Sequence, residues 1–113
     1  MAVGRLIDMD ESRRRAEQLL TLSSGARRLA DVIAVAEGPV RYEVLRHLVR
    51  VSEETMTEVL QEAVDARLVR RAADPFTYVP YDDQVGSEIR AGIEPARAER
   101  MRRQIENARR EVE

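Results

Sequence analysis

Apolar residues recur every three or four positions along most of the chain, which predicts a protein built mainly from helices. The pattern is clearest in residues 25–37 and 53–66, where aliphatic side chains share one face and charged side chains the other. The two apolar stripes consist of Leu29, Val32, Ile33 and Ala36, and of Met56, Val59, Leu60, Ala63 and Val64. We predict helices over residues 10–22, 25–37, 39–49, 53–66, 83–92 and 95–113.

Capping residues place several of the helix boundaries. Ser52 and either Asp82 or Asp83 precede helical segments, and each can accept a hydrogen bond from a free backbone amide of the first turn. Gly38 is a helix stop signal, and Pro39 suits the first position of a helix. The helix over residues 39–49 is therefore predicted to begin at Pro39.

The helical period breaks down between the fourth and fifth predicted helices. Leu68 and Val69 begin a short strand-like run, and residues 73–75 (ADP) form a turn signal. Residues 76–79 (FTYV) are aromatic or β-branched and are typical of a returning strand. We predict a β-hairpin over residues 68–79.

Three helices followed by a hairpin form the winged helix-turn-helix plan. The predicted fold is therefore mainly α, with a three-helix core, a two-stranded wing, and flanking helices at both termini. With 113 residues and 4% aromatic residues, the chain has the length of one domain and the composition of a charged helical protein. We expect a flexible arm over residues 1–9 and a single winged-helix-like domain over residues 10–113, extended by the helix 95–113.

The composition excludes several kinds of catalytic and metal site. The chain has no cysteine. All 19 of its Lys and Arg positions are arginine, so it has no lysine, and His47 is its one histidine. Thiolate zinc sites, P-loops and Schiff-base chemistry are therefore excluded. His47 lies off the apolar stripe of its helix, and no nucleophile elbow or EF-hand loop is present. We expect no enzymatic activity, no metal and no cofactor.

The N-terminal residues do not form a secretory signal, because they lack an apolar core and reach Asp8 early. No apolar run approaches the ~18 residues of a membrane-spanning helix. The sequence therefore predicts a cytoplasmic protein with no membrane partner.

The predicted recognition helix of the winged-helix plan is acidic. Residues 51–66 contain five acids and no arginine, and Glu58, Glu62 and Asp65 fall on the exposed side of the helix. Such a face has the wrong charge for the phosphates that line a DNA groove. It favours a protein partner and disfavours DNA binding through this helix.

When charges are compared segment by segment, Arg67, Arg70 and Arg71 form the one unopposed basic cluster, and it lies beside the predicted wing. Two interpretations are open. The arginines can neutralise the acidic helix that precedes them, or they can contact DNA from the wing.

The C-terminal helix carries apolar residues at alternating spacings of three and four, namely Ala98, Met101, Ile105, Ala108 and Val112. This spacing favours packing of one amphipathic helix against its own domain. It also permits a homodimer or a partner contact centred on Met101 and Ile105.

Three phrases of the chain resemble the winged-helix-like segment that follows the ATPase module in large LuxR-type regulators and related STAND signalling ATPases. The phrases are residues 36–39 (AEGP), 64–69 (VDARLV) and 95–105 (PARAERMRRQI), and the resemblance covers about residues 29–108. It implies a winged-helix-like fold and a role as a relay between an ATPase and a sensor. The chain departs from the family pattern at residues 78–82 (YVPYD), which lack the family's histidine.

These observations lead to one expected function and one alternative. We expect a non-enzymatic winged-helix module that acts through protein–protein interaction in transcription or signalling regulation. The alternative is a small dimeric DNA-binding regulator that uses the wing-side arginines.

Overall fold

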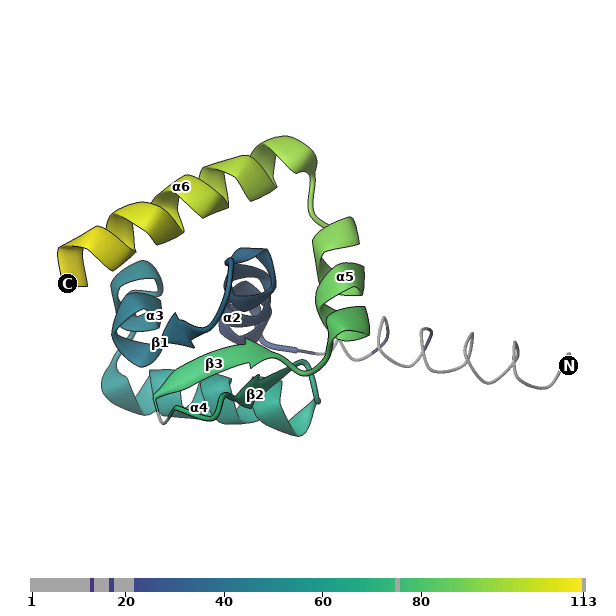
Figure 1. Cartoon of the computed structure of the whole chain (residues 1–113). Coiled ribbons are helices and arrows are strands. Elements are labelled where there is room, and N and C mark those ends of the chain that lie inside the picture. The colour runs from purple at the N-terminus through teal and green to yellow at the C-terminus, as the bar shows by residue number, and fades with distance from the viewer. Residues whose placement is uncertain (1–12, 14–16, 18–21, 75, 113) are drawn as a thin grey trace, which may run out of the picture.

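The computed structural model of the chain describes residues 13, 17, 22–74 and 76–112 (Figure 1). Arg13 and Glu17 have helical backbone and exposed side chains. The predicted arm over residues 1–9 and the rest of the predicted helix over residues 10–22 lie outside the described residues.

The described residues form five helices and three short strands. In chain order these are α2 (Ser24–Val35), β1 (Val40–Arg41), α3 (Tyr42–Leu48), α4 (Glu53–Asp65), β2 (Val69–Arg71), β3 (Thr77–Pro80), α5 (Asp83–Ala91) and α6 (Pro95–Val112). The predicted hairpin and the helices over residues 25–37, 53–66, 83–92 and 95–113 are confirmed, with small differences at their ends. The protein is mainly helical with a small antiparallel sheet.

The region after α2 differs from the prediction, because Pro39 does not begin a helix. Gly38 adopts a left-handed backbone with φ of 73°, which turns the chain out of α2. Val40 and Arg41 then form the strand β1, and α3 begins at Tyr42. Val40 is fully buried, so its branched side chain gains more in the sheet than it would in an exposed first helical turn.

The strand β1 adds a third member to the predicted hairpin. The sheet has the order β1-β3-β2, and both pairings are antiparallel. Val40 lies opposite Tyr78 on one side of β3, and Arg70 lies opposite Val79 on the other. The central position of β3 connects the hairpin to the helical part of the molecule.

The helix α2 is the centre of the core and contacts α4, α5, α6 and β3. Its residues Leu29 and Ile33 are fully buried. The long helix α6 crosses over α2 and α3, on the side of the molecule away from the sheet (Figure 1). This arrangement leaves α4 and α6 on opposite sides of the central helix.

The apolar stripe of α6 is part of the protein's own core. Met101 is 8% exposed and Ile105 is 2% exposed, and α6 packs on α2 and α3. The expectation of an open docking or dimer seam centred on Met101 and Ile105 is therefore wrong, because α6 packs both side chains against its own domain and leaves only small parts of them accessible. Packing of α6 against its own domain is confirmed.

Side-chain caps begin three of the helices. The Ser23 Oγ accepts a hydrogen bond from the Ala26 amide, the Ser52 Oγ from the Thr55 amide, and the Asp82 carboxylate from the Val85 amide. Each such cap stabilises a helix by about 1 kcal/mol. The predicted caps at Ser52 and Asp82 are confirmed.

Candidate functional site

The helix α4 presents an acidic face to solvent. Its apolar residues, including Met56 and Ala63, are buried against α2 and the sheet. Its exposed positions include Glu53, Glu54, Glu58, Gln61 and Asp65. Within the described part of the chain, the carboxylates of Glu54 and Glu58 form no ion pair, so this acidic face remains uncompensated.

Glu62 has a different position from the other acids of α4. Its Oε1 accepts a hydrogen bond from the Ser23 amide at 2.8 Å, and its Oε2 accepts one from the Ser23 hydroxyl at 2.8 Å. It therefore places a negative charge at the N-terminus of α2, where the helix dipole favours one and where the first turn has no acid of its own. The structure thus assigns Glu62 to holding α4 against α2, whereas the sequence pattern placed it on the free face.

The three arginines predicted to form a cluster, Arg67, Arg70 and Arg71, point in different directions in the structure. Arg67 follows α4, while Arg70 and Arg71 are neighbours on β2 and so project from opposite faces of the strand. The Arg70 Nε donates a hydrogen bond to the Tyr81 carbonyl oxygen at 3.1 Å. Arg67 and Arg71 remain exposed.

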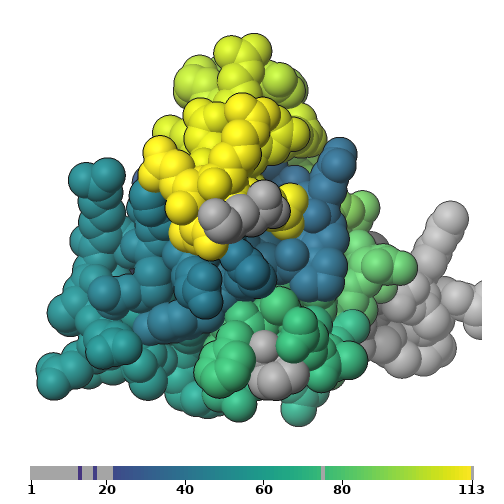
Figure 2. Space-filling model, turned by 60° about the vertical axis from the view of Figure 1, so that its left-hand side comes forward, coloured from purple at the N-terminus to yellow at the C-terminus, as the bar shows by residue number. Residues whose placement is uncertain are grey.

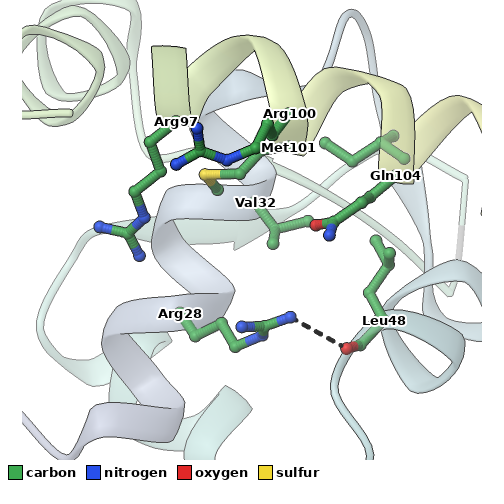
Figure 3. Close-up of a pocket in the computed structure, with 8 residues that line it drawn as sticks. Arg28, Val32, Leu48, Arg97, Arg100, Met101 and Gln104 are labelled. Atoms are coloured by element: carbon green, nitrogen blue, oxygen red, sulfur yellow. Dashed lines mark hydrogen bonds between the residues drawn. The ribbon is translucent and has the colours of Figure 1, made fainter. Parts of the chain in front are cut away.

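A groove bordered by arginines lies between α2, α6 and the segment that links α3 to α4. Figure 2 shows α6 (yellow) as a ridge above the rest of the molecule, and Figure 3 shows the groove beneath it. Its inner part has a volume of about 200 Å³. We call this feature the arginine groove, and it is lined by Arg28, Val32, Leu48, Arg97, Arg100, Met101, Gln104 and Ile105.

The arginine groove continues into a shallower depression that adds Arg27, Asp31 and Arg50 to its lining. Asp31 is the one acid among the residues that line either part. The lining therefore combines five arginines with a single carboxylate, and the groove is strongly basic.

Two of the arginines have partners inside the groove. The Arg97 Nη2 lies 3.7 Å from the Asp31 Oδ2, and the Arg28 Nη2 donates to the Leu48 carbonyl oxygen at 3.4 Å (Figure 3). Burial raises the pKa of the Asp31 carboxyl above its usual value, against the opposing effects of Arg97 and then Arg27. Keeping the half-buried Asp31 carboxylate ionised therefore costs free energy. The guanidinium of Arg97 can still bind another anion.

The sequence pattern missed the arginine groove because its residues are far apart in the chain. Arg27 and Arg28 belong to α2, Arg50 to the link before α4, and Arg97 and Arg100 to α6. The helical spacing of Arg97 and Arg100 was the one local signal. The groove exists because the apolar stripe of α6 packs across α2.

Among the residues that the structure describes, no group of three or more His, Asp or Glu side chains could hold a metal ion. The Nε2 of His47 lies 2.7 Å from the Oε2 of Glu111 in an exposed pair that joins α3 to α6. No helix among the described residues is long and apolar enough to cross a membrane.

Comparison with known proteins gives no family to which the chain can be assigned. No protein-family model, no curated protein and no solved structure matches it.

Proposed function

We propose that the chain is a non-enzymatic module of winged-helix type that binds a protein partner through the acidic face of α4, in transcription or signalling regulation. The element order α2-β1-α3-α4-β2-β3 and the strand order β1-β3-β2 support a winged-helix arrangement. In that arrangement α4 has the position of the recognition helix and the β2–β3 hairpin is the wing.

The observation that carries this proposal is the charge of the exposed face of α4. Glu54, Glu58 and Asp65 would approach the phosphates of a DNA groove with like charge, and no arginine on α4 would offset the repulsion. The same carboxylates suit a partner surface rich in arginine or lysine. Because each exposed ion pair contributes only about 0–1 kcal/mol, their combined field would act mainly on orientation and on the rate of association.

Charge reversal on α4 tests the proposal. The variant Glu54→Arg/Glu58→Arg should fold normally, since both side chains are exposed and unpaired among the described residues. It should lose the partners that the unaltered chain cross-links to through α4 in extracts of its source, as measured by quantitative mass spectrometry. The matched control is Glu106→Arg, which reverses an exposed acid on α6 and should retain them. Retention of every partner by the double variant would refute the proposal.

A second candidate is DNA binding through the arginines beside the wing, and the exposed side chains of Arg67 and Arg71 favour it. Arg67 has φ of 58°, in the region where glycine is preferred, at the position that follows the C-cap of α4. That backbone belongs to a Schellman motif at the end of α4, in which the Arg67 amide donates to the Val64 carbonyl oxygen and the Leu68 amide donates to the Ala63 carbonyl oxygen. This candidate predicts that Arg67→Gly weakens DNA binding and lowers its salt dependence.

A further inference from the structure

The arginine groove is bordered by α2, α6 and the link before α4, and it needs an occupant of opposite charge to the partner of α4. We propose that it binds an acidic amphipathic segment of a partner polypeptide, one in which carboxylate and aliphatic side chains alternate. This second site is independent of the function proposed for α4.

The floor of the groove is aliphatic. Leu48 is partly exposed there, and the small accessible parts of Val32, Met101 and Ile105, each at most 8% exposed, line the rest. No aromatic residue lines either part of the groove, so it offers no surface on which a nucleic-acid base could stack. The floor therefore suits aliphatic side chains such as leucine or isoleucine.

The walls of the groove are matched to carboxylates. The guanidinium group of arginine binds a carboxylate through two parallel hydrogen bonds. Arg100 and Gln104 have no hydrogen-bond or ion-pair partner among the described residues, and both border the inner part of the groove (Figure 3). Their donors are therefore available to a ligand.

Asp31 shows that the groove accepts a carboxylate beside an arginine. Its Oδ2 approaches the guanidinium of Arg97, although burial disfavours the charged form of Asp31. A carboxylate from a partner can replace it at Arg97 from the solvent side, where more than half of the Arg97 side chain is exposed. Asp31 would thus compete with the ligand.

The surroundings of the groove favour a short peptide over a nucleic-acid duplex. Glu99 adjoins Arg100 on α6 and lies near Arg102 and Arg103, at 3.5 and 3.7 Å. The basic surface is therefore interrupted along α6 and concentrated within the groove. A DNA duplex binds a basic surface that extends along its row of phosphates, whereas a short acidic peptide needs positive charge only opposite its few carboxylates.

Fluorescence anisotropy of a labelled peptide of alternating aspartate and leucine, titrated with the full chain, tests the proposal. We expect binding that falls about tenfold in Arg100→Gln, which removes a charge-assisted hydrogen bond. The matched control Arg71→Gln removes an exposed arginine outside the groove and should leave binding unchanged. Asp31→Asn removes the internal competitor and should tighten binding a few-fold.

Control ligands separate this occupant from others. Peptides with asparagine in place of aspartate, or serine in place of leucine, should bind weakly, and the methyl resonances of Val32 and Met101 should shift only with the acidic, leucine-containing peptide. Equal binding of the serine peptide, or no binding of the aspartate–leucine peptide, would overturn the proposal. So would duplex DNA binding that Arg100→Gln removes, or a homodimer in sedimentation that the same substitution dissociates.

Discussion

The acidic face of α4 and the arginine groove carry opposite charge and arise in different ways. The face of α4 is a property of one continuous helix, in which buried and exposed positions alternate with the helical period. The arginine groove combines side chains from α2, from the link before α4 and from α6. One surface is therefore inherent in a local segment, while the other exists only when the whole domain is folded.

This difference determines how the two surfaces respond to mutation. A change in the packing of α6 should disrupt the groove and leave the acidic face of α4 in place. Changes on the exposed side of α4 should alter its charge without altering the groove. The predictions below use this separation, from the largest expected effect to the smallest.

The largest effect is expected for Ile105→Ala. Ile105 is 2% exposed on the buried side of α6, so truncation should lower the free energy of unfolding by about 2–4 kcal/mol through lost burial and a cavity. Urea denaturation measures this loss. Unchanged stability combined with a change in oligomeric state would mean that the residue belongs to an intermolecular seam, contrary to the structure.

A smaller effect is expected for Glu62→Ala. The substitution removes both hydrogen bonds to Ser23 and a favourable charge at the N-terminus of α2, and should lower the free energy of unfolding by about 1 kcal/mol. Glu58→Ala, one helical turn away and exposed, is the matched control and should change stability by less than about 0.5 kcal/mol. Equal effects of the two substitutions in chemical denaturation would contradict the distinction between these acids.

The pH dependence of stability should reveal the cost of Asp31. Because burial raises the pKa of Asp31 in the folded state, the folded protein binds this proton more readily than the unfolded chain does. Ionised Asp31 therefore lowers the free energy of unfolding at neutral pH. This destabilisation should disappear as the pH falls through the folded-state pKa towards the ordinary value of 3.8. Asp31→Asn should be more stable than the unaltered chain at neutral pH, and this advantage should shrink on acidification. Chemical denaturation at a series of pH values measures this difference. If the stability advantage of Asp31→Asn grew in acid, the pKa of Asp31 would be lowered in the folded state and not raised.

The smallest effect is expected for Arg67→Gly. Glycine adopts the left-handed backbone of this position without strain, so the free energy of unfolding should rise by about 0.5–1 kcal/mol. Arg71→Gly, at a position in β2 with ordinary strand backbone, should instead be destabilising. A loss of stability in Arg67→Gly would show that the arginine side chain has a structural role in the fold.

Local signals predicted much of the fold. The caps at Ser52 and Asp82 and the apolar stripe of α4 each depend on neighbouring residues, and each is found where the pattern placed it. The strand β1 could not be predicted in this way. It has two residues, and it forms because the edge of β3, distant in sequence, offers hydrogen-bonding partners.

The two surfaces proposed to bind partners follow the same division. The exposed acids of α4, among them Glu58, were predictable from helical spacing, but the contact of Glu62 with Ser23 spans 39 positions and was not. The arginine groove was not predicted because residues 96–113 contain six arginines and four acids, so the net charge of this segment is small. Only the packing of α6 turns Arg97 and Arg100 towards α2.

The measurement that tests the central claim most directly is the anisotropy of a GC-rich DNA duplex titrated with the chain at ~50 and ~200 mM salt. An interface of several phosphate contacts would bind at the lower salt and lose roughly 10³–10⁵ in affinity at the higher. If the acidic face of α4 directs this module to protein, micromolar chain should leave the anisotropy unchanged at both salt concentrations. Tight binding at low salt with a steep loss at high salt, abolished by Arg67→Gly and retained in Glu54→Arg/Glu58→Arg, would contradict the account and establish the wing as a DNA-binding surface.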